Sequence, residues 1–229
     1  MKCAIMQPTY LPWLGYFHLI NQVEKFVFLD NVQVVKRSWD VRNRIKTVDG
    51  ELYLTVPLKK TTSRNETTFV NAKIDYDQSW VKKHLRSIEV AYRKAKYFEE
   101  IYELIKECLS EKHNSLSELN SSIIVKFSEY LELKTEFLWA SELKKIVGKK
   151  DALLVSICKE ISCREYLSPV GAAVYIEAES AGGEFGRREL DLEYQTFKHP
   201  IYSQLFGKFV SHLSVVDAVM NCGVKVKIS

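Results

Sequence analysis

The stretch that decides the fold runs from Cys3 to Asp30, CAIMQPTYLPWLGYFHLINQVEKFVFLD. Residues 3–6 and 26–29 are short apolar runs, which predict two buried strands. Between them lie a loop rich in proline and aromatic residues and an amphipathic stretch over residues 17–23. Ligands of α/β sheets bind where a strand ends and the chain turns into a helix, so we expect a binding site in this loop.

The composition is that of an ordinary soluble globular protein. The chain has 229 residues, of which 46% are hydrophobic and 27% charged, and its net charge of +4 is a mild excess. We attribute this excess to a local anion site, because the sequence has no Lys/Arg block and no RNA-binding signature. Its five cysteines form no Cys-x-x-Cys pair, which fits the reducing cytoplasm and argues against a thiolate zinc site.

Two further patterns bear on localisation. Pro8 interrupts the N-terminal apolar run too early for a signal peptide. No run approaches the length of apolar sequence that a transmembrane helix needs. We therefore expect a cytoplasmic protein without a membrane span.

Apolar periodicity and capping residues predict the elements that follow. We expect strands over 52–57 and 190–197, and helices over 80–91, 97–109, 115–131, 151–161 and 214–221. Their predicted N-caps are Ser115, Asp151 and Ser214, and Gly223 closes the last helix. We predict an α/β protein, a single domain over 1–229, with a strand-rich N-terminal core and a helical insert or subdomain around 80–160.

Two segments near the N-terminus are candidates for ligand binding. In the aromatic loop, Tyr10, Trp13 or Tyr16 could stack on a ring; the alternative is that the loop packs its aromatics into the core. Behind it, residues 30–46 carry five Lys and Arg side chains. Arginine pairs well with phosphate, so we favour an anion site; the alternative is an exposed basic edge strand.

Three segments towards the C-terminus could contribute to the same pocket. The turn over 168–171 brings backbone N–H groups and a glycine together, although it could equally just end a strand. The loop over 199–204 combines a histidine with phenol and amide groups. Ser214 and Asp217 have capping-box spacing, whereas His199 or His212 could act as a general base. A Ser/His/Asp triad is disfavoured, because Ser214 lacks the nucleophile-elbow glycines.

The chain resembles the WbqC-like proteins of bacterial polysaccharide gene clusters over almost its whole length. The motifs that carry the resemblance include Ile5–Pro8, Pro12–Phe17, Phe28–Asp30, Lys36–Trp39, Asn43–Ile45, Thr55–Pro57, Trp80, Leu167–Gly171, Tyr202–Gln204, His212–Ser214, Asp217 and Asn221–Gly223.

This resemblance implies a role in the biosynthesis of surface polysaccharide of the O-antigen type. It implies a transferase that forms an amide, acyl or aminoacyl, on the amine of a nucleotide-linked amino-deoxy sugar. The cofactor is left open: an activated acyl or aminoacyl donor, of which a charged tRNA is one form, or ATP. The oligomeric state is also left open.

Two other functions remain open. One is an ATP-dependent ligase, which the strand–loop–helix opening favours; however, Trp13 and Tyr16 stand where nucleotidyl-transfer enzymes carry histidines. The other is a sugar-nucleotide-binding accessory protein without catalysis.

We predict catalytic roles for Asp30, His199 and His212, and no metal site. The predicted substrate-binding residues are Gln7, Tyr10, Trp13, Tyr16, Gln33, Lys36, Arg37, Trp39, Asn43, Arg44, Ser168, Gly171, Tyr202, Gln204, Asp217 and Asn221.

Overall fold

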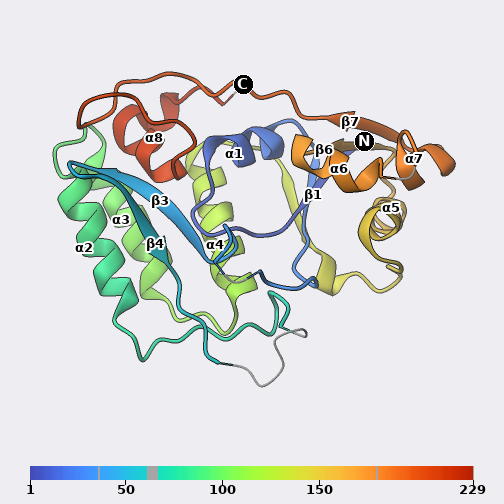
Figure 1. Ribbon diagram of the computed structural model, residues 1–229, viewed down its shortest axis with the longest axis horizontal. Coiled ribbons are helices and arrows are strands. Elements are labelled where there is room, and N and C mark those ends of the chain that lie inside the picture. Colours follow the sequence, from blue (N-terminus) through green and yellow to red (C-terminus); the bar gives the residue numbers. More distant parts are fainter. Residues whose placement is uncertain (36, 61–66, 179, 229) are drawn as a thin grey trace. The chain divides into compact units, whose positions relative to one another are not determined.

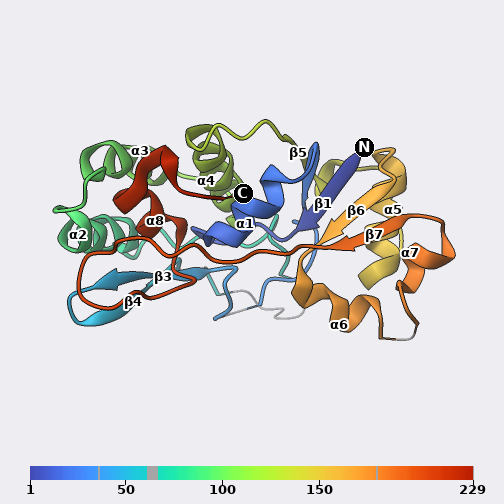
Figure 2. The ribbon, with the colours of Figure 1, turned by 90° about the horizontal axis from the view of Figure 1, so that it is seen from above.

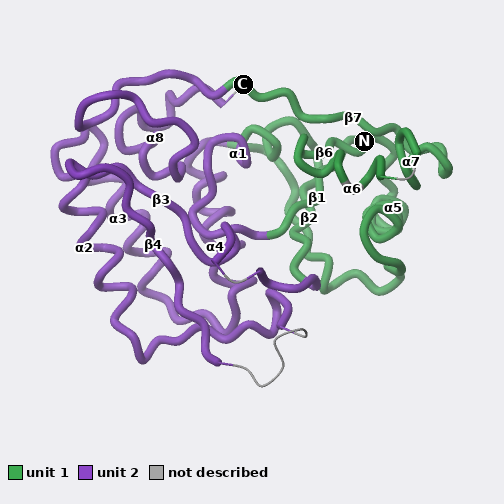
Figure 3. The backbone as a smooth tube through the Cα atoms, viewed as in Figure 1, with its two compact units in different colours: residues 1–7, 18–30, 133–198 green, residues 8–17, 31–132, 199–229 purple. Residues whose placement is uncertain are grey.

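The computed structural model describes residues 1–35, 37–60, 67–178 and 180–228. It has a mixed α/β fold, as predicted (Figure 1). The chain forms two compact units. Unit 1 comprises residues 1–7, 18–30 and 133–198, and unit 2 comprises residues 8–17, 31–132 and 199–229 (Figure 3). That the chain forms one domain over 1–229 stays a prediction.

Unit 1 is built on a five-stranded sheet in which every pair of neighbours is parallel. The strand order is β5-β2-β1-β6-β7, which in chain order reads third, second, first, fourth, fifth. This is the strand order of the doubly wound α/β fold, in which the direction of winding reverses beside the first strand. The strands are β1 (Lys2–Met6), β2 (Lys25–Phe28), β5 (Glu136–Trp139), β6 (Glu165–Ser168) and β7 (Asp191–Tyr194).

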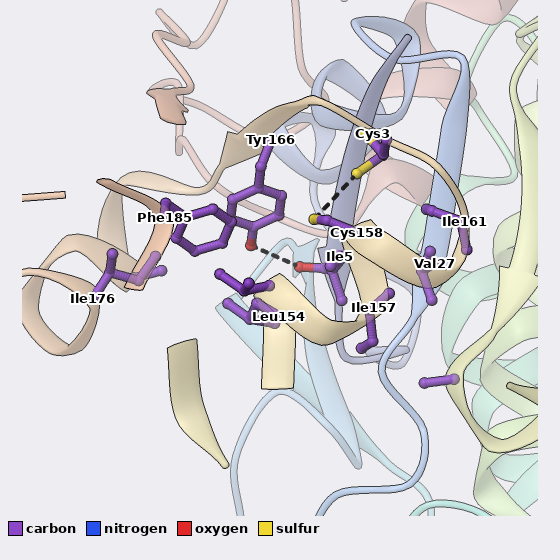
Figure 4. Packing of buried hydrophobic residues seen from close by; sticks show 14 residues of the cluster. Cys3, Ile5, Val27, Leu154, Ile157, Cys158, Ile161, Tyr166, Ile176 and Phe185 are labelled. Carbon is purple, nitrogen blue, oxygen red and sulfur yellow. Dashed lines mark hydrogen bonds between the residues drawn. The ribbon is translucent and has the colours of Figure 1, made fainter. Parts of the chain in front are cut away.

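One apolar core holds unit 1 together. Strands β1, β2 and β6 contribute buried side chains that pack against helix α5 (Lys150–Glu160) (Figure 4). The short helices α6 (Ala173–Ile176) and α7 (Gly183–Arg187) close this core through Ile176 and Phe185. The ring of Phe185 stacks on Tyr166 with centroids 4.8 Å apart. Cys3 and Ile5, on alternate positions of β1, thus lie on the face of the sheet that α5 covers.

Unit 2 joins an antiparallel hairpin to a group of helices. Strand β3 (Arg42–Thr47) pairs with β4 (Gly50–Thr55), and β3 packs on helices α2 (Trp80–Tyr92) and α8 (Val215–Cys222). Helix α3 (Phe98–Ser110) packs on α2, and helix α4 (Leu116–Tyr130) packs on α3 (Figure 2). In helix α1 (Leu14–Asn21), residues 14–17 belong to unit 2 and residues 18–21 to unit 1. Short 3-10 turns lie at Ala140–Glu142 and Val170–Ala172 in unit 1 and at Gly223–Lys225 in unit 2.

The predicted helices and strands are present, and one predicted cap is corrected. Ser115 caps α4, because its Oγ accepts from the N–H of Glu118 at 3.2 Å. Asp151 is not the N-cap of α5: Lys149 holds that position, and the Asp151 carboxylate in the first turn accepts from the N–H of Ala152 and of Glu184. Helix α2 buries His84 between Trp80 and Ile88, and Leu85 is only partly buried.

Gly223 ends α8 for a steric reason. Its φ is +62°, and a Cβ at this position would lie 2.7 Å from the ring of Tyr97. Both the backbone conformation and the close approach therefore require glycine. Among the described residues, no helix is long and apolar enough to cross a membrane.

The stacked ring of Phe185 gives the first testable prediction. Truncation by Phe185→Ala opens a cavity beside Tyr166 and should lower the free energy of unfolding by about 3–5 kcal/mol. The matched control is Val174→Ala, whose parent side chain is 83% exposed. Urea denaturation measures both, and a loss below about 1 kcal/mol for Phe185→Ala would contradict the packing described.

Candidate functional site

A buried carboxylate organises the candidate site of unit 2. Asp217 lies in the first turn of α8 and is completely buried. Its carboxylate accepts three side-chain hydrogen bonds: from the hydroxyl of Tyr92 at 2.8 Å, the hydroxyl of Tyr202 at 2.9 Å and Nε2 of Gln204 at 2.7 Å. Burial raises the pKa of Asp217, and these three donors counteract the rise.

The Asp217 carboxylate therefore does not complete a capping box with Ser214. Ser214 is the N-cap as predicted, but its Oγ accepts from the N–H of Val216. Asn221 bonds within the same helix, since its Nδ2 donates to the Asp217 carbonyl at 2.7 Å. Direct contact of Asp217 or Asn221 with a ligand stays a prediction.

A buried lysine ties this network to the hairpin. Lys46 on β3 donates from Nζ to Oε1 of Gln204 at 3.1 Å and to the carbonyl of Lys208 at 2.6 Å. Gln204 in turn holds Val210 through its Oε1 and Nε2, at 2.8 Å each. These bonds fix the segment over residues 199–214, which we call the histidine segment, onto β3.

The histidine segment brings both predicted histidines together. The ring centroids of His199 and His212 are 5.1 Å apart, and both rings lie against the indole of Trp13, at 6.3 Å and 4.8 Å. Tyr202 flanks His199 on the same segment at 6.2 Å. Four of the residues singled out from the sequence thus form one aromatic cluster, although they come from positions up to two hundred residues apart.

The electrostatics of this cluster favour a neutral His199. Partial burial lowers the pKa of His199, and the neighbouring His212 lowers it further. The Nδ1 atom of His199 donates to the carbonyl of Pro200 at 2.8 Å, so Nε2 is the basic nitrogen of the neutral ring. His212 is exposed and has a φ of +58°, a strained conformation of the kind found at functional sites.

Backbone contacts place the indole of Trp13 in this cluster. Trp13 forms an isolated β-bridge with Ser214, and the N–H of Ser214 donates to the carbonyl of Arg44 on β3. A Cβ on Gly15 would lie 2.2 Å from the indole, so glycine is required for the ring to occupy this position. The glycine in the Pro12–Phe17 motif therefore serves to seat Trp13.

The other aromatics of this loop pack into the core. Tyr10 and Tyr16 are fully buried, and the hydroxyl of Tyr10 lies 3.0 Å from Nδ1 of His84. Asn43 supports the loop by donating to the carbonyls of Tyr10 and Leu11. For Tyr10 and Tyr16 the structure agrees with the packing interpretation, whereas Trp13 remains partly exposed.

The basic segment, residues 30–46, contains both paired and exposed side chains. Arg44 forms an ion pair with Glu51 at 2.6 Å, and Trp39 is 47% exposed. Arg37 is exposed with a φ of +66°, and Gln33 forms a β-bridge with Thr68. Lys36 lies outside the described residues. A role of this segment in phosphate binding stays a prediction.

Four predicted site residues belong to unit 1. Gln7 follows β1 and Ser168 ends β6, the two neighbours between which the winding of the sheet reverses. Asp30 is buried and accepts from the N–H and Oγ of Ser141, at 2.9 Å and 2.8 Å. Gly171 lies in the 3-10 turn after Ser168. Their part in ligand binding stays a prediction.

Sequence reasoning missed three members of the site: Lys46 as a buried anchor, Tyr92 and Phe209. Lys46 is one of five Lys and Arg residues over 30–46, and nothing in the sequence separates it from the other four. Tyr92 lies at the end of a helix whose buried face is predicted to be apolar. Phe209 packs edge-on against His199 and Tyr202, at 5.8 Å and 5.3 Å. The sequence signal that could have found Tyr92 is the eight-residue spacing from His84 along the buried face of α2.

An α/β protein with a doubly wound parallel sheet and a histidine–aromatic cluster is the class that this fold and site define. The chain belongs to the WbqC-like protein family, whose model matches residues 7–228. It is 33% identical over 223 residues, 97% of this chain and 94% of the relative, to the uncharacterized protein Rv1507c of Mycobacterium tuberculosis. No solved structure matches the chain. In the described part of the chain, no group of three His, Cys, Asp or Glu side chains is placed to hold a metal ion.

Removal of the central carboxylate should destabilise the protein. In Asp217→Ala the buried Tyr92 and the partly buried Tyr202 and Gln204 lose their acceptor, so we expect the free energy of unfolding to fall by about 3–5 kcal/mol. Asp217→Asn keeps one acceptor oxygen and should lose less. Urea denaturation measures both, with the exposed Asp191→Asn as control. Equal stability of Asp217→Ala and wild type would contradict the network.

His84 predicts a pH dependence of stability. Burial lowers its pKa from 6.5 to about 4, and Tyr10 is its side-chain partner. Between these values the unfolded chain binds a proton that the folded protein excludes, so stability falls as the pH drops through this window, by roughly 3 kcal/mol. His84→Gln keeps an acceptor for Tyr10 and should flatten the slope between pH 7 and pH 4 in urea denaturation. An unchanged slope would contradict the assignment.

Proposed function

We propose that the protein is a transferase that forms an amide on the amine of a nucleotide-linked amino-deoxy sugar. The donor is an activated acyl or aminoacyl group, and the reaction serves the biosynthesis of surface polysaccharide. The observation that carries the proposal is the pair His199 and His212, which lies against Trp13 on a segment that hydrogen bonds fix to β3.

Amide formation needs a base, because a sugar amine is largely protonated at neutral pH and attacks only after losing its proton. The lowered pKa of His199 keeps its ring neutral under these conditions. Nε2 would take the proton from the ammonium group. The amine nitrogen then attacks the donor carbonyl carbon, a C–N bond forms, and the bond to the leaving group breaks. The leaving group departs with its electron pair and takes the second proton of the amine nitrogen, which leaves a neutral amide.

The other members of the cluster would bind and orient. The flat indole of Trp13 offers an apolar surface to the face of a sugar ring, as aromatic side chains commonly do in ligand sites. His212 is exposed beside it and can donate or accept a hydrogen bond. Asp217 acts as a positioning residue, since it holds Tyr202 and Gln204 on the histidine segment. Positioning of this kind supplies a large part of enzymatic rate enhancement.

The sheet of unit 1 favours a second candidate, an ATP-dependent ligase. Its strand order is that of nucleotide-binding doubly wound folds, with the reversal between β1 and β6. In this reaction ATP would first activate the carboxyl group of the acyl or amino acid, and the sugar amine would then displace phosphate or AMP. A thermal-shift screen separates the candidates: stabilisation by ATP alone supports the ligase, and stabilisation by a sugar nucleotide supports the transferase.

Replacement of the base should abolish most of the activity. His199→Gln keeps a hydrogen-bonding side chain but no basic nitrogen, so we expect kcat to fall by about 10²- to 10⁴-fold with little change in sugar-nucleotide affinity. Mass spectrometry of the sugar product over defined times measures the rate, with the buried-core variant His84→Gln as the histidine control. Full activity in His199→Gln would rule out His199 as the base. If the wild-type protein binds the sugar nucleotide but forms no amide with any donor, the accessory-protein alternative is favoured.

A further inference from the structure

The hairpin of unit 2 exposes two large aromatic side chains that the reaction above does not use. Trp39 precedes β3 and is 47% exposed, and Tyr53 on β4 is 46% exposed. Their rings stack on each other, with centroids 6.2 Å apart and planes inclined by 22°. An exposed, contiguous aromatic surface is costly in water, and it commonly marks a binding site.

Two arginines extend this stack. The guanidinium carbon of Arg42 lies 4.8 Å from the ring centroid of Tyr53, and that of Arg44 lies 5.8 Å from the ring of Trp39. Arg42 and Arg44 are two positions apart on β3, and Arg44 is paired in register with Tyr53. Because strand side chains alternate, these three share one face of the hairpin. We call Trp39, Arg42, Arg44 and Tyr53 the stacking platform.

The platform keeps hydrogen-bonding capacity for a ligand. Arg44 uses Nη1 for the ion pair with Glu51, and its buried Nε has no hydrogen-bond partner among the described residues. Arg42 forms no ion pair with a described carboxylate, so none of the described residues neutralises its charge. A buried donor without a partner costs free energy, which a bound acceptor oxygen would recover.

The backbone holds the platform in place next to the histidine segment. The N–H of Tyr10 donates to the carbonyl of Trp39 at 3.1 Å, and the N–H of Ser214 donates to the carbonyl of Arg44 at 3.0 Å. Strand β3 therefore carries the two arginines of the platform and also seats the residues that position His212. A ligand with two recognisable parts could contact both.

We propose that the stacking platform binds the nucleobase and adjacent phosphate of the nucleotide-linked substrate. The base stacks on Trp39 and Tyr53, and the phosphate oxygens accept from Arg42 and Arg44. A nucleotide combines a flat π-surface with negative charge, and both are complementary to alternating aromatic and guanidinium groups. A free sugar lacks the ring and the charge, and a fatty acyl chain lacks the flat ring. This proposal rests on the proposed function in assigning the nucleotide to the sugar substrate.

The test measures binding alone, by calorimetric titration of the full chain with UDP, dTDP, ADP and GDP, and with pyrophosphate as the probe that lacks a base. Trp39→Ala and Tyr53→Ala should weaken binding of the preferred nucleoside diphosphate by about 10- to 100-fold and leave pyrophosphate binding unchanged. Arg42→Ala and Arg44→Ala should weaken the binding of both probes. The side chains of Trp39 and Tyr53 are exposed, so their variants should fold, which circular dichroism checks.

Matched controls come from helices α2 and α3 of the same unit: Tyr102→Ala for the aromatic variants and Arg86→Ala for the arginine variants. Nucleotide affinity unchanged in all four platform variants would overturn the proposal, as would an equal loss in the controls. The outcome separates from that of the transferase. If the wild type forms the amide but the platform variants bind nucleotide as the wild type does, only the platform proposal is wrong. If the platform variants lose nucleotide binding but the wild type forms no amide, the platform proposal is supported and only the transferase proposal is wrong.

Discussion

The candidate site depends on one constraint: the carboxylate of Asp217 is buried and must be satisfied. Three donors from α2 and the histidine segment converge on it, and Lys46 adds a buried cation that bonds to one of them. A buried carboxylate that loses one of its hydrogen-bond partners costs free energy, so the network allows few alternative arrangements of the histidine segment. The position of His199 next to Trp13 follows from this restriction, and so does the support of β3 under the histidine segment.

The polar candidate residues are held in different ways in the two units. In unit 1 the parallel sheet is covered by apolar packing, and polar residues such as Gln7 and Ser168 follow at the carboxyl ends of strands. In unit 2 the functional candidates lie on loops and on a two-stranded hairpin, held by side-chain hydrogen bonds. Loops carry function well when a rigid scaffold fixes them. Buried hydrogen bonds supply that rigidity here.

Local signals in the sequence predicted the elements, and long-range contacts decided the site. Ser115 as a cap and the apolar runs of β1 and β2 depend on neighbours within a few residues, so pattern reasoning found them. It missed Lys46, which bonds to Gln204 158 positions away, and Tyr92, which bonds to Asp217 125 positions away. The aromatic loop shows the same limit, because no local pattern distinguishes Tyr10, which is buried, from Trp13, which is partly exposed. Their loop positions and titratable rings single out His199 and His212 as candidate bases, but no local pattern in the sequence places the two rings together.

The most direct test of the account follows the histidine side chains by NMR while a nucleotide-linked amino sugar is added. If the Trp13 cluster receives the sugar, the ring signals of His199 and His212 should shift with saturating behaviour, and those of the buried His84 should stay unchanged. A pH titration of the same ring signals without ligand gives the pKa of His199, which should lie below its usual value. Ring signals of His199 and His212 that do not respond to a sugar nucleotide that binds the protein would contradict the account.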